Sequence, residues 1–330
     1  MTIIRQVKIR QILGSAALAL ATAWALLLLT HALQVPARAA DRVVRIGYQK
    51  YGNFILLKGT GALDKTLAAQ GVAVEWTEFP SGPPLLEALN AGAIDIGQAG
   101  EAPPIFAQAA NAGFVYIAHE PPAPQGEAIL VPKDSAIKSV ADLKGKKVAL
   151  NKGSNVHYLL VQLLQQSGVK YSEIQPVFLA PADARAAFET GTVDAWAIWD
   201  PYQAAAEVAI KARTLADGTG AVANNQFYLA SKSFADANPH IVDTVLAAVD
   251  DVDRWAEGNS SAVAQQLSAG IGIPAPVLEI ALKRQTYGIK PLDDATVAAQ
   301  QKIRHGRYER ARENERADQR EDDRLGHGPE

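Results

Sequence analysis

The stretch that decides the fold is LEALNAGAIDIGQAGEAP, residues 86–103, because it recurs in related form as RAAFETGTVDAWAIWDP, residues 185–201. Three pairs of residues lie 99 positions apart in the two stretches: Gly92 and Gly191, Asp95 and Asp194, and Glu101 and Asp200. Each stretch predicts a short helix ended by Gly, an Asp at the start of a strand, and an acidic residue that opens the next helix. The chain therefore contains an internal repeat, and we expect two similar α/β lobes.

The strands and helices around each repeat alternate, which is typical of parallel sheets. Open parallel sheets bind ligands at the carboxyl ends of their strands, so two such lobes facing each other would form a cleft. The loops expected at this cleft are residues 49–53, 80–84, 100–102, 151–155, 180–184 and 199–201.

One of these loops has the features of an anion site. A strand over residues 148–150 leads through Asn151-Lys152-Gly153-Ser154-Asn155 into an amphipathic helix. The free N–H groups of the first turn, the helix dipole, a Gly and a Ser hydroxyl together suit a tetrahedral anionic head group. The P-loop signature is absent, so a nucleotide is not expected.

The N-terminus has the pattern of a secretory signal peptide. Basic residues precede an apolar stretch over residues 12–29, and Ala37 and Ala39 occupy the small-residue positions of a cleavage site. We expect residues 1–39 to be removed, although a retained membrane anchor is the alternative for so long an apolar run.

Two β-like runs indicate where the chain crosses between the lobes. Residues 127–131 and 225–230 are interpreted as paired crossover strands, and two crossings permit hinge closure. Lobe one then comprises residues 40–128 and 227–303, and lobe two comprises residues 129–226.

The segment 304–330 has 15 charged residues among 27 and almost no apolar surface, so it is expected to be a disordered or solvated tail. Its abrupt Arg-rich composition also raises the alternative of a reading-frame shift.

Composition excludes several classes of protein and site. The chain of 330 residues is 48% hydrophobic and 20% charged with a net charge of −3, which offers no field for nucleic acid or an anionic membrane. Its 0 cysteines exclude disulfides and thiolate metal sites, and its 6 scattered histidines give no metal-ligand pattern. We therefore expect no metal and no cofactor.

Several segments resemble the periplasmic aliphatic-sulfonate-binding proteins of ABC transporters. The similar segments are residues 47–53, 76–80, 100–104, 120–124, 143–148, 151–160, 182–188 and 199–203. The resemblance extends from about Arg45 to Ile303 and implies an α/β, type II periplasmic-binding-protein fold with a central cleft. It also implies capture of alkanesulfonates for sulfur supply, delivery to an inner-membrane permease, a periplasmic location and a monomeric state.

The predicted ligand-binding residues come from the expected cleft loops and the second crossover strand. They are Gln49, Tyr51, Ser81, Gly82, Gly100, Glu101, Gly153, Ser154, Asn155, His157, Trp199, Asp200 and Tyr228. Gln49, Ser81, Ser154 and Asn155 are interpreted as donors to the head group, because neutral donors can satisfy a desolvated sulfonate without a buried cation.

The remaining candidates keep two interpretations each. His157 either lines the cleft or packs against the neighbouring loop. Glu101 and Asp200 are awkward beside an anion and are interpreted as N-caps, the alternative being a contact with the amine of an aminosulfonate. The aromatic candidates either wall the apolar part of the ligand or belong to the core.

Two alternatives concern function. The sequence does not distinguish an alkanesulfonate from taurine, nitrate or a thiamine precursor, nor does it set the chain length of the ligand. A periplasmic enzyme with Ser154 as nucleophile and His157 as base is a different class. We predict no enzyme and no catalytic residue, because no third group to orient the histidine can be assigned.

Overall fold

The computed structural model describes residues 42–304. The predicted signal peptide lies outside the described residues. So does the predicted tail, apart from Arg304, which lies in a helix.

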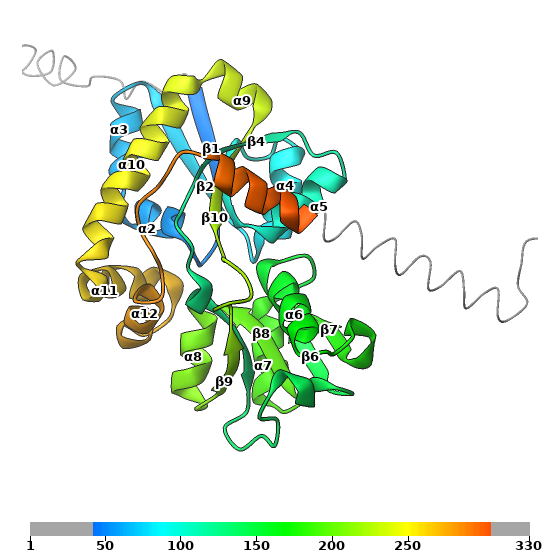
Figure 1. The fold of residues 1–330 in the computed structure, drawn as a ribbon. Helices are drawn as coiled ribbons and strands as arrows, with labels where there is room; N and C mark the ends of the chain where they lie inside the picture. Colours follow the sequence, from blue (N-terminus) through cyan, green and yellow to red (C-terminus); the bar gives the residue numbers. More distant parts are fainter. Residues whose placement is uncertain (1–41, 305–330) are drawn as a thin grey trace, which may run out of the picture. The chain divides into compact units, whose positions relative to one another are not determined.

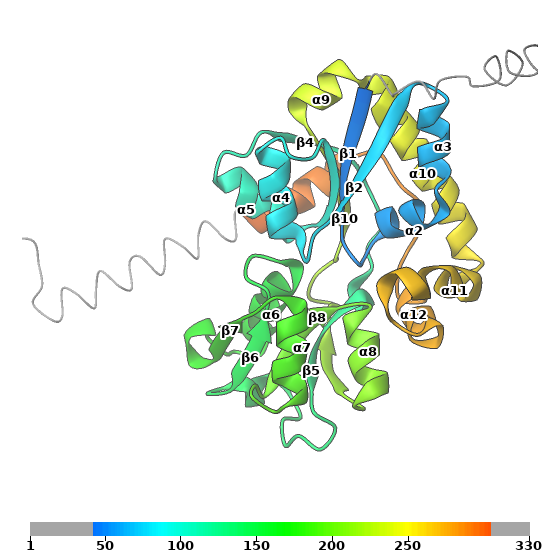
Figure 2. The same cartoon turned by 180° about the vertical axis from the view of Figure 1, so that it is seen from behind.

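Two five-stranded sheets form the framework, each with its own helices (Figures 1 and 2). The first sheet has the order β2-β1-β3-β10-β4, with β1 (Arg42–Tyr48), β2 (Val72–Glu78), β3 (Ile96–Gly100), β4 (Phe114–His119) and β10 (Gln226–Ser231). The second has the order β7-β6-β8-β5-β9, with β5 (Glu127–Val131), β6 (Lys147–Leu150), β7 (Gln175–Phe178), β8 (Ala195–Trp199) and β9 (Arg213–Asp217).

Helices cover both sheets. Those that precede the second sheet along the chain are α2 (Asn53–Thr60), α3 (Ala62–Ala68), α4 (Gly82–Asn90) and α5 (Ala102–Ala109). The second sheet carries α6 (Asn155–Gln166), α7 (Pro181–Glu189) and α8 (Tyr202–Ala209). The C-terminal helices are α9 (Lys232–Ala237), α10 (Pro239–Glu257), α11 (Ser260–Ile271), α12 (Ala275–Leu282) and a last helix over residues 294–304. Short 3-10 helices occur at Pro124–Gly126, Val140–Leu143 and Tyr171–Glu173.

The expectation of parallel sheets is wrong for one strand in each sheet. Strand β10 runs antiparallel to β3 and β4, and β5 runs antiparallel to β8 and β9, whereas β1 and β3, β6 and β7, and β6 and β8 are parallel. The chain enters β5 from the first sheet and β10 from the second, so each of these strands begins at the edge where its parallel neighbours end: Glu127 is opposite Trp199, and Gln226 is opposite Gly100. Both sheets are therefore mixed.

Two of the three residue pairs of the internal repeat are equivalent in the structure. Gly92 and Gly191 both have φ of +71°, the left-handed conformation that ends a helix without a Cβ clash. Asp95 accepts the backbone N–H of Arg45 in β1 at 2.9 Å, and Asp194 accepts that of Lys147 in β6 at 2.8 Å. In each sheet the repeated Asp thus fastens its own strand to the parallel neighbour.

The two crossover segments are hydrogen-bonded to each other, whereas β5 and β10, the strands into which they lead, are not. The N–H of Glu120 donates to the carbonyl of Gln226 at 2.8 Å, and the N–H of Ala123 donates to the carbonyl of Ala223 at 3.0 Å. Strand β5 lies in the second sheet and β10 in the first, so pairing between the two strands, as predicted, does not occur.

Each sheet has its own apolar core. In the first sheet's part, α10 packs with α2 and α3 on one side, and α4 and α5 contact β3 on the other (Figures 1 and 2). A separate cluster around Trp196, Leu160 and Ile129 fills the second sheet's part. These cores hold the strand ends from which the site is built.

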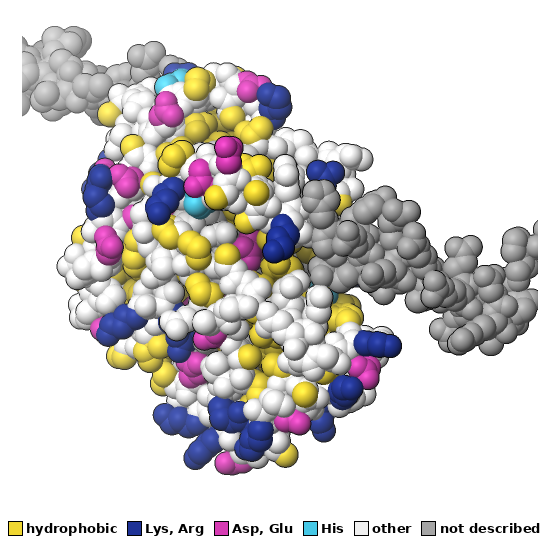
Figure 3. Space-filling view, in the orientation of Figure 1, with side chains coloured by type: hydrophobic (Ala, Val, Ile, Leu, Met, Phe, Trp, Pro, Cys, Tyr) yellow, Lys and Arg dark blue, Asp and Glu magenta, His cyan; other side chains and the backbone are white. Residues whose placement is uncertain are grey.

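The face seen in Figure 3 carries acidic and basic side chains intermixed, with several Lys and Arg gathered at its lower end. In the part of the chain that the structure describes, no helix is both long and apolar enough to cross a membrane.

Candidate functional site

The turn before α6 is braced by its own side chains. Gly153 has φ of +76°, and its N–H donates to Nδ1 of His157 at 3.1 Å. The Ser154 hydroxyl donates to the carbonyl of Asn151 at 2.7 Å and makes no cap bond to the helix. The N–H groups of Asn155 and Val156 begin the helix and have no carbonyl of their own helix to bind. These are the N–H groups that the sequence predicts to face an anion, and their binding of one stays a prediction.

A small cavity of about 30 Å³ lies next to this turn. It is lined by Gln49, Tyr51, Gly82, Gly100, Pro103, Glu127, Ser154, Asn155, Trp199, Asn224 and Gln226. The carboxyl ends of β1, β3, β6 and β8 all contribute, as expected for strands of this topology. The expected loop over residues 180–184 contributes none of these residues.

The cavity thus brings together seven of the predicted residues: Gln49, Tyr51, Gly82, Gly100, Ser154, Asn155 and Trp199. Their role in ligand binding stays a prediction. Gln49 is held by a hydrogen bond from its Nε2 to the carbonyl of Gln98 at 3.0 Å.

The side chain of Asn155 is hydrogen-bonded to two other segments of the chain. Its Oδ1 accepts the N–H of Ala102 at 3.0 Å, and its Nδ2 donates to Oδ1 of Asn224 at 2.8 Å. A Cβ on Gly100 would lie 2.1 Å from that Nδ2, so only Gly leaves room for the amide. Asn155 therefore links the start of α5 to the second crossover segment.

The other predicted residues do not line the cavity. His157 packs among Phe106, Tyr171 and Phe178, with ring centroids 5.6 to 6.3 Å away, which agrees with the second of its two interpretations. Ser81 is buried beside Gly82, and Gly153 lies outside the lining. A side chain at Gly153 would be strained whether or not a ligand binds, since its φ is positive.

Tyr228 does not line the cavity and belongs to the core, the second of its two interpretations. It is fully buried in the core of the first sheet, and its hydroxyl donates to Oε1 of Glu120 at 2.5 Å. Its ring lies 5.0 Å from that of Phe54. Strand β10 is an interior strand with both faces covered, so a large aromatic side chain there belongs to the core.

Glu101 does not cap its helix. Its carboxylate accepts the N–H groups of Asn224 at 3.0 Å and Asn225 at 3.3 Å, across the cavity wall. Asp200 does accept an N–H of the helix it precedes, that of Ala204 at 3.1 Å, and it pairs with Arg284 at 3.4 Å. Burial raises the pKa of both carboxyl groups to about 7.

Four cavity residues were missed by the sequence reasoning: Pro103, Glu127, Asn224 and Gln226. The last three belong to the crossover segments or to the first residues of β5 and β10. The signal that could have found them is their position, because a segment that passes between two sheets at their carboxyl ends must border the cleft.

Buried carboxyl groups predict a protein that loses stability as the pH rises above about 5. Burial raises the pKa of each of Glu101, Glu120, Glu127, Asp200 and Asp253 above its ordinary value. The folded state then binds more protons than the unfolded state between about pH 4.5 and 8, so the stabilisation is present at low pH and lost through that window. We expect the melting temperature in phosphate and acetate buffers to be several degrees lower at about pH 8.5 than at about pH 5.5. A melting temperature that stays constant or rises would contradict this.

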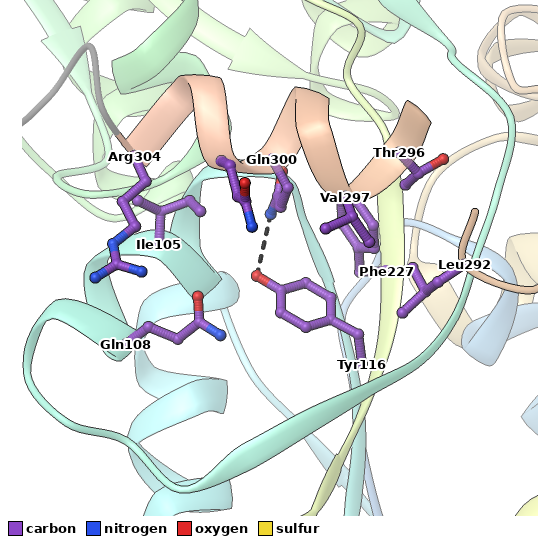
Figure 4. A pocket seen from close by; sticks show the side chains of 10 residues that line it. Ile105, Gln108, Tyr116, Phe227, Leu292, Thr296, Val297, Gln300 and Arg304 are labelled. Carbon is purple, nitrogen blue, oxygen red and sulfur yellow. Dashed lines mark hydrogen bonds between the residues drawn. The ribbon is translucent and has the colours of Figure 1, made fainter. Parts of the chain in front are cut away.

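A second pocket lies under the last helix (Figure 4). It is lined by Ile105, Gln108, Tyr116, Phe227, Leu292, Thr296, Val297, Gln300, Gln301 and Arg304. Gln300 donates to the hydroxyl of Tyr116 at 3.1 Å and to the carbonyl of Glu101 at 2.7 Å. The last helix is thereby tied to the beginning of α5, and the sequence reasoning predicted no site here.

No group of His, Cys, Asp or Glu side chains within residues 42–304 could hold a metal ion. The cavity lining also contains no Lys, Arg or His. What the cavity offers is amide donors, a hydroxyl, helix N–H groups, two aromatic rings and one carboxyl group, which suits binding of a small molecule with an anionic head.

Comparisons with known proteins give one consistent family. The NMT1/THI5 like family matches residues 67–257. An aliphatic sulfonates-binding protein of Escherichia coli strain K12 is 45% identical over 285 residues, covering 86% of this chain and 89% of the relative.

Two solved structures are similar along most of the chain. The alkanesulfonate-binding protein SsuA from Xanthomonas axonopodis pv. citri, bound to MOPS, has a TM-score of 0.75 and 42% identity, covering 78% of this chain and 90% of that one. The periplasmic aliphatic sulphonate binding protein SsuA from Escherichia coli has a TM-score of 0.73 and 45% identity, covering 82% of this chain and 87% of that one.

Proposed function

This chain belongs to the aliphatic-sulfonate-binding proteins within the NMT1/THI5-like family, and from this membership we propose that it captures aliphatic sulfonates for an ABC importer that supplies sulfur. The predicted periplasmic-binding-protein fold is confirmed by the two mixed α/β sheets and the similarity to the two SsuA structures.

One observation carries the proposal: the N-terminus of α6 lies at a cavity whose other polar side chains are neutral, with one exception. A sulfonate has three acceptor oxygens and a delocalised charge, so backbone N–H groups and amides can satisfy it without a cation. In the proposed complex the N–H groups of Asn155 and Val156 hold the head group, with the side chains of Asn155, Gln49 and Ser154 beside them.

A catalytic role for Ser154 and His157 is disfavoured by what these side chains do. The Ser154 hydroxyl donates to Asn151, and Nδ1 of His157 accepts the N–H of Gly153, so both atoms brace the turn. We propose a solute-binding protein with no enzymatic activity.

The same family membership supports the rest of the proposal. We propose that the protein acts in the periplasm as a monomer after removal of residues 1–39, and that it delivers its ligand to an inner-membrane permease. Two lobes with boundaries near residues 128 and 227 would close over the ligand.

Titration calorimetry with a matched pair of ligands tests the function. We expect butane-1-sulfonate to bind at least about tenfold more tightly than pentanoate, because the three oxygens of a sulfonate meet more donors than a carboxylate does. The buffer must be phosphate, since a sulfonate buffer would compete. Equal or tighter binding of pentanoate, nitrate or a pyrimidine would overturn the sulfonate assignment, and turnover of the bound ligand would show an enzyme.

A further inference from the structure

Glu127 is the one acidic side chain in the cavity lining, which contains no basic residue. It is the first residue of β5, opposite Trp199 in β8, and it is 0% exposed. Neither of its carboxyl oxygens has a hydrogen-bond partner among residues 42–304. A buried carboxyl group without partners costs free energy, so a ligand group that pairs with Glu127 would be stabilised.

The neighbouring acids already have partners. The carboxylate of Glu101 accepts N–H groups of Asn224 and Asn225, and that of Asp200 pairs with Arg284. Arg284 also pairs with Glu207 and does not line the cavity. Glu127 therefore lies in an acidic part of the site with no cation of the described chain to neutralise it, which favours a positively charged ligand group over a second anion.

Aromatic rings in the same lining strengthen this preference. Tyr51 and Trp199 line the cavity together with Glu127. The buried Tyr51 hydroxyl has no hydrogen bond of normal geometry within the described chain. Ring faces beside a carboxyl group attract an ammonium ion through its charge.

We propose that Glu127 binds the protonated amine of a zwitterionic sulfonate whose sulfonate head lies at the N-terminus of α6, which makes aminosulfonates the preferred ligands. This inference rests on the proposed function and adds the class of ligand. The alternative is that Glu127 stays protonated and donates a hydrogen bond to the ligand.

The two alternatives differ in whether binding of the ligand releases a proton from Glu127. Burial, and secondarily the charge of Glu101, raise the pKa of Glu127 well above its ordinary value, which favours the neutral carboxyl group as long as no cation is bound. An ammonium group restores the charged form, so binding of an aminosulfonate at neutral pH releases a proton. A plain alkanesulfonate leaves Glu127 protonated and releases none.

A ligand pair that differs only at the far end tests the proposal: 3-aminopropane-1-sulfonate carries an ammonium group where butane-1-sulfonate has a methyl group. We expect the parent protein to bind the amine-containing ligand more tightly. Glu127→Gln should lose about tenfold or more in affinity for that ligand while butane-1-sulfonate changes by less than about threefold. Glu120→Gln, a buried acid outside the cavity, should affect both ligands equally.

Proton release is measured on the parent protein by calorimetry in phosphate and in Tris, which needs no variant to fold. About one proton per bound 3-aminopropane-1-sulfonate, and none for butane-1-sulfonate, is the expected result. Equal loss of both ligands in Glu127→Gln, or no proton release, overturns the role of Glu127 and leaves the proposed function intact. If neither sulfonate binds the parent protein, the proposed function itself fails.

Discussion

Replacing Gly100 by Ala is expected to weaken sulfonate binding about a hundredfold. The new Cβ would lie 2.1 Å from Nδ2 of Asn155, so the Asn155 side chain must leave its place. Its bonds to Ala102 and Asn224 are then lost, and its amide no longer faces the cavity. A hydrogen bond to a charged ligand contributes about 1.5 to 3 kcal/mol, or roughly 10- to 150-fold in Kd, and displacement of the side chain into the cavity adds to that loss.

The prediction depends on contact between two residues, so a double-mutant cycle tests it. Asn155→Ala should itself weaken binding, but adding Gly100→Ala to it should cost little more, because the space is then empty. Gly113→Ala is the matched control, since a Cβ there meets no heavy atom within 4 Å. Titration of all five proteins with butane-1-sulfonate decides the matter, and additive losses in the cycle would show that Gly100 matters for another reason.

The sequence predicted the helices and strands of the repeat well because the residues that end the helices act locally. Gly92 and Gly191 end helices in the left-handed conformation, which depends on their own backbone only. The residues at the carboxyl ends of β1, β2, β3, β6 and β8 followed from topology, and seven of them do line one cavity.

The errors come from features that depend on the assembled sheets. Tyr228 and Phe227 alternate along β10, and whether either side chain reaches a cleft depends on how β10 is covered, which the local pattern does not contain. Glu127, Asn224 and Gln226 reach the cavity because the crossover segments pass beside it. Glu101 accepts N–H groups from residues more than 120 positions away, a contact that only the folded chain creates.

Removing the guanidinium of Arg284 is expected to destabilise the protein by about 3 kcal/mol at about pH 8.5. Arg284 follows α12 and pairs with Asp200, which is 1% exposed, and with Glu207 on α8, so it joins the C-terminal helices to the second sheet's part. When Arg284→Ala removes the guanidinium group, the Asp200 carboxylate remains buried without a cation to pair with. Lys232→Ala is the control, because the ion pair of Lys232 with Asp236 is exposed on both sides and should contribute less than about 1 kcal/mol.

The cost of Arg284→Ala should depend on pH with a definite sign. The pKa of Asp200 is about 7, raised chiefly by burial, so the carboxyl group is charged at about pH 8.5 and neutral at about pH 5.5. At the lower pH the variant loses only its pairing with Glu207, a partly exposed group, and the free energy of unfolding should fall by about 1 kcal/mol or less. Urea unfolding of the parent and the variant at both pH values measures the two differences. A cost that is equal at both pH values, or larger at the lower one, would mean that Asp200 is not the partner through which Arg284 stabilises the fold.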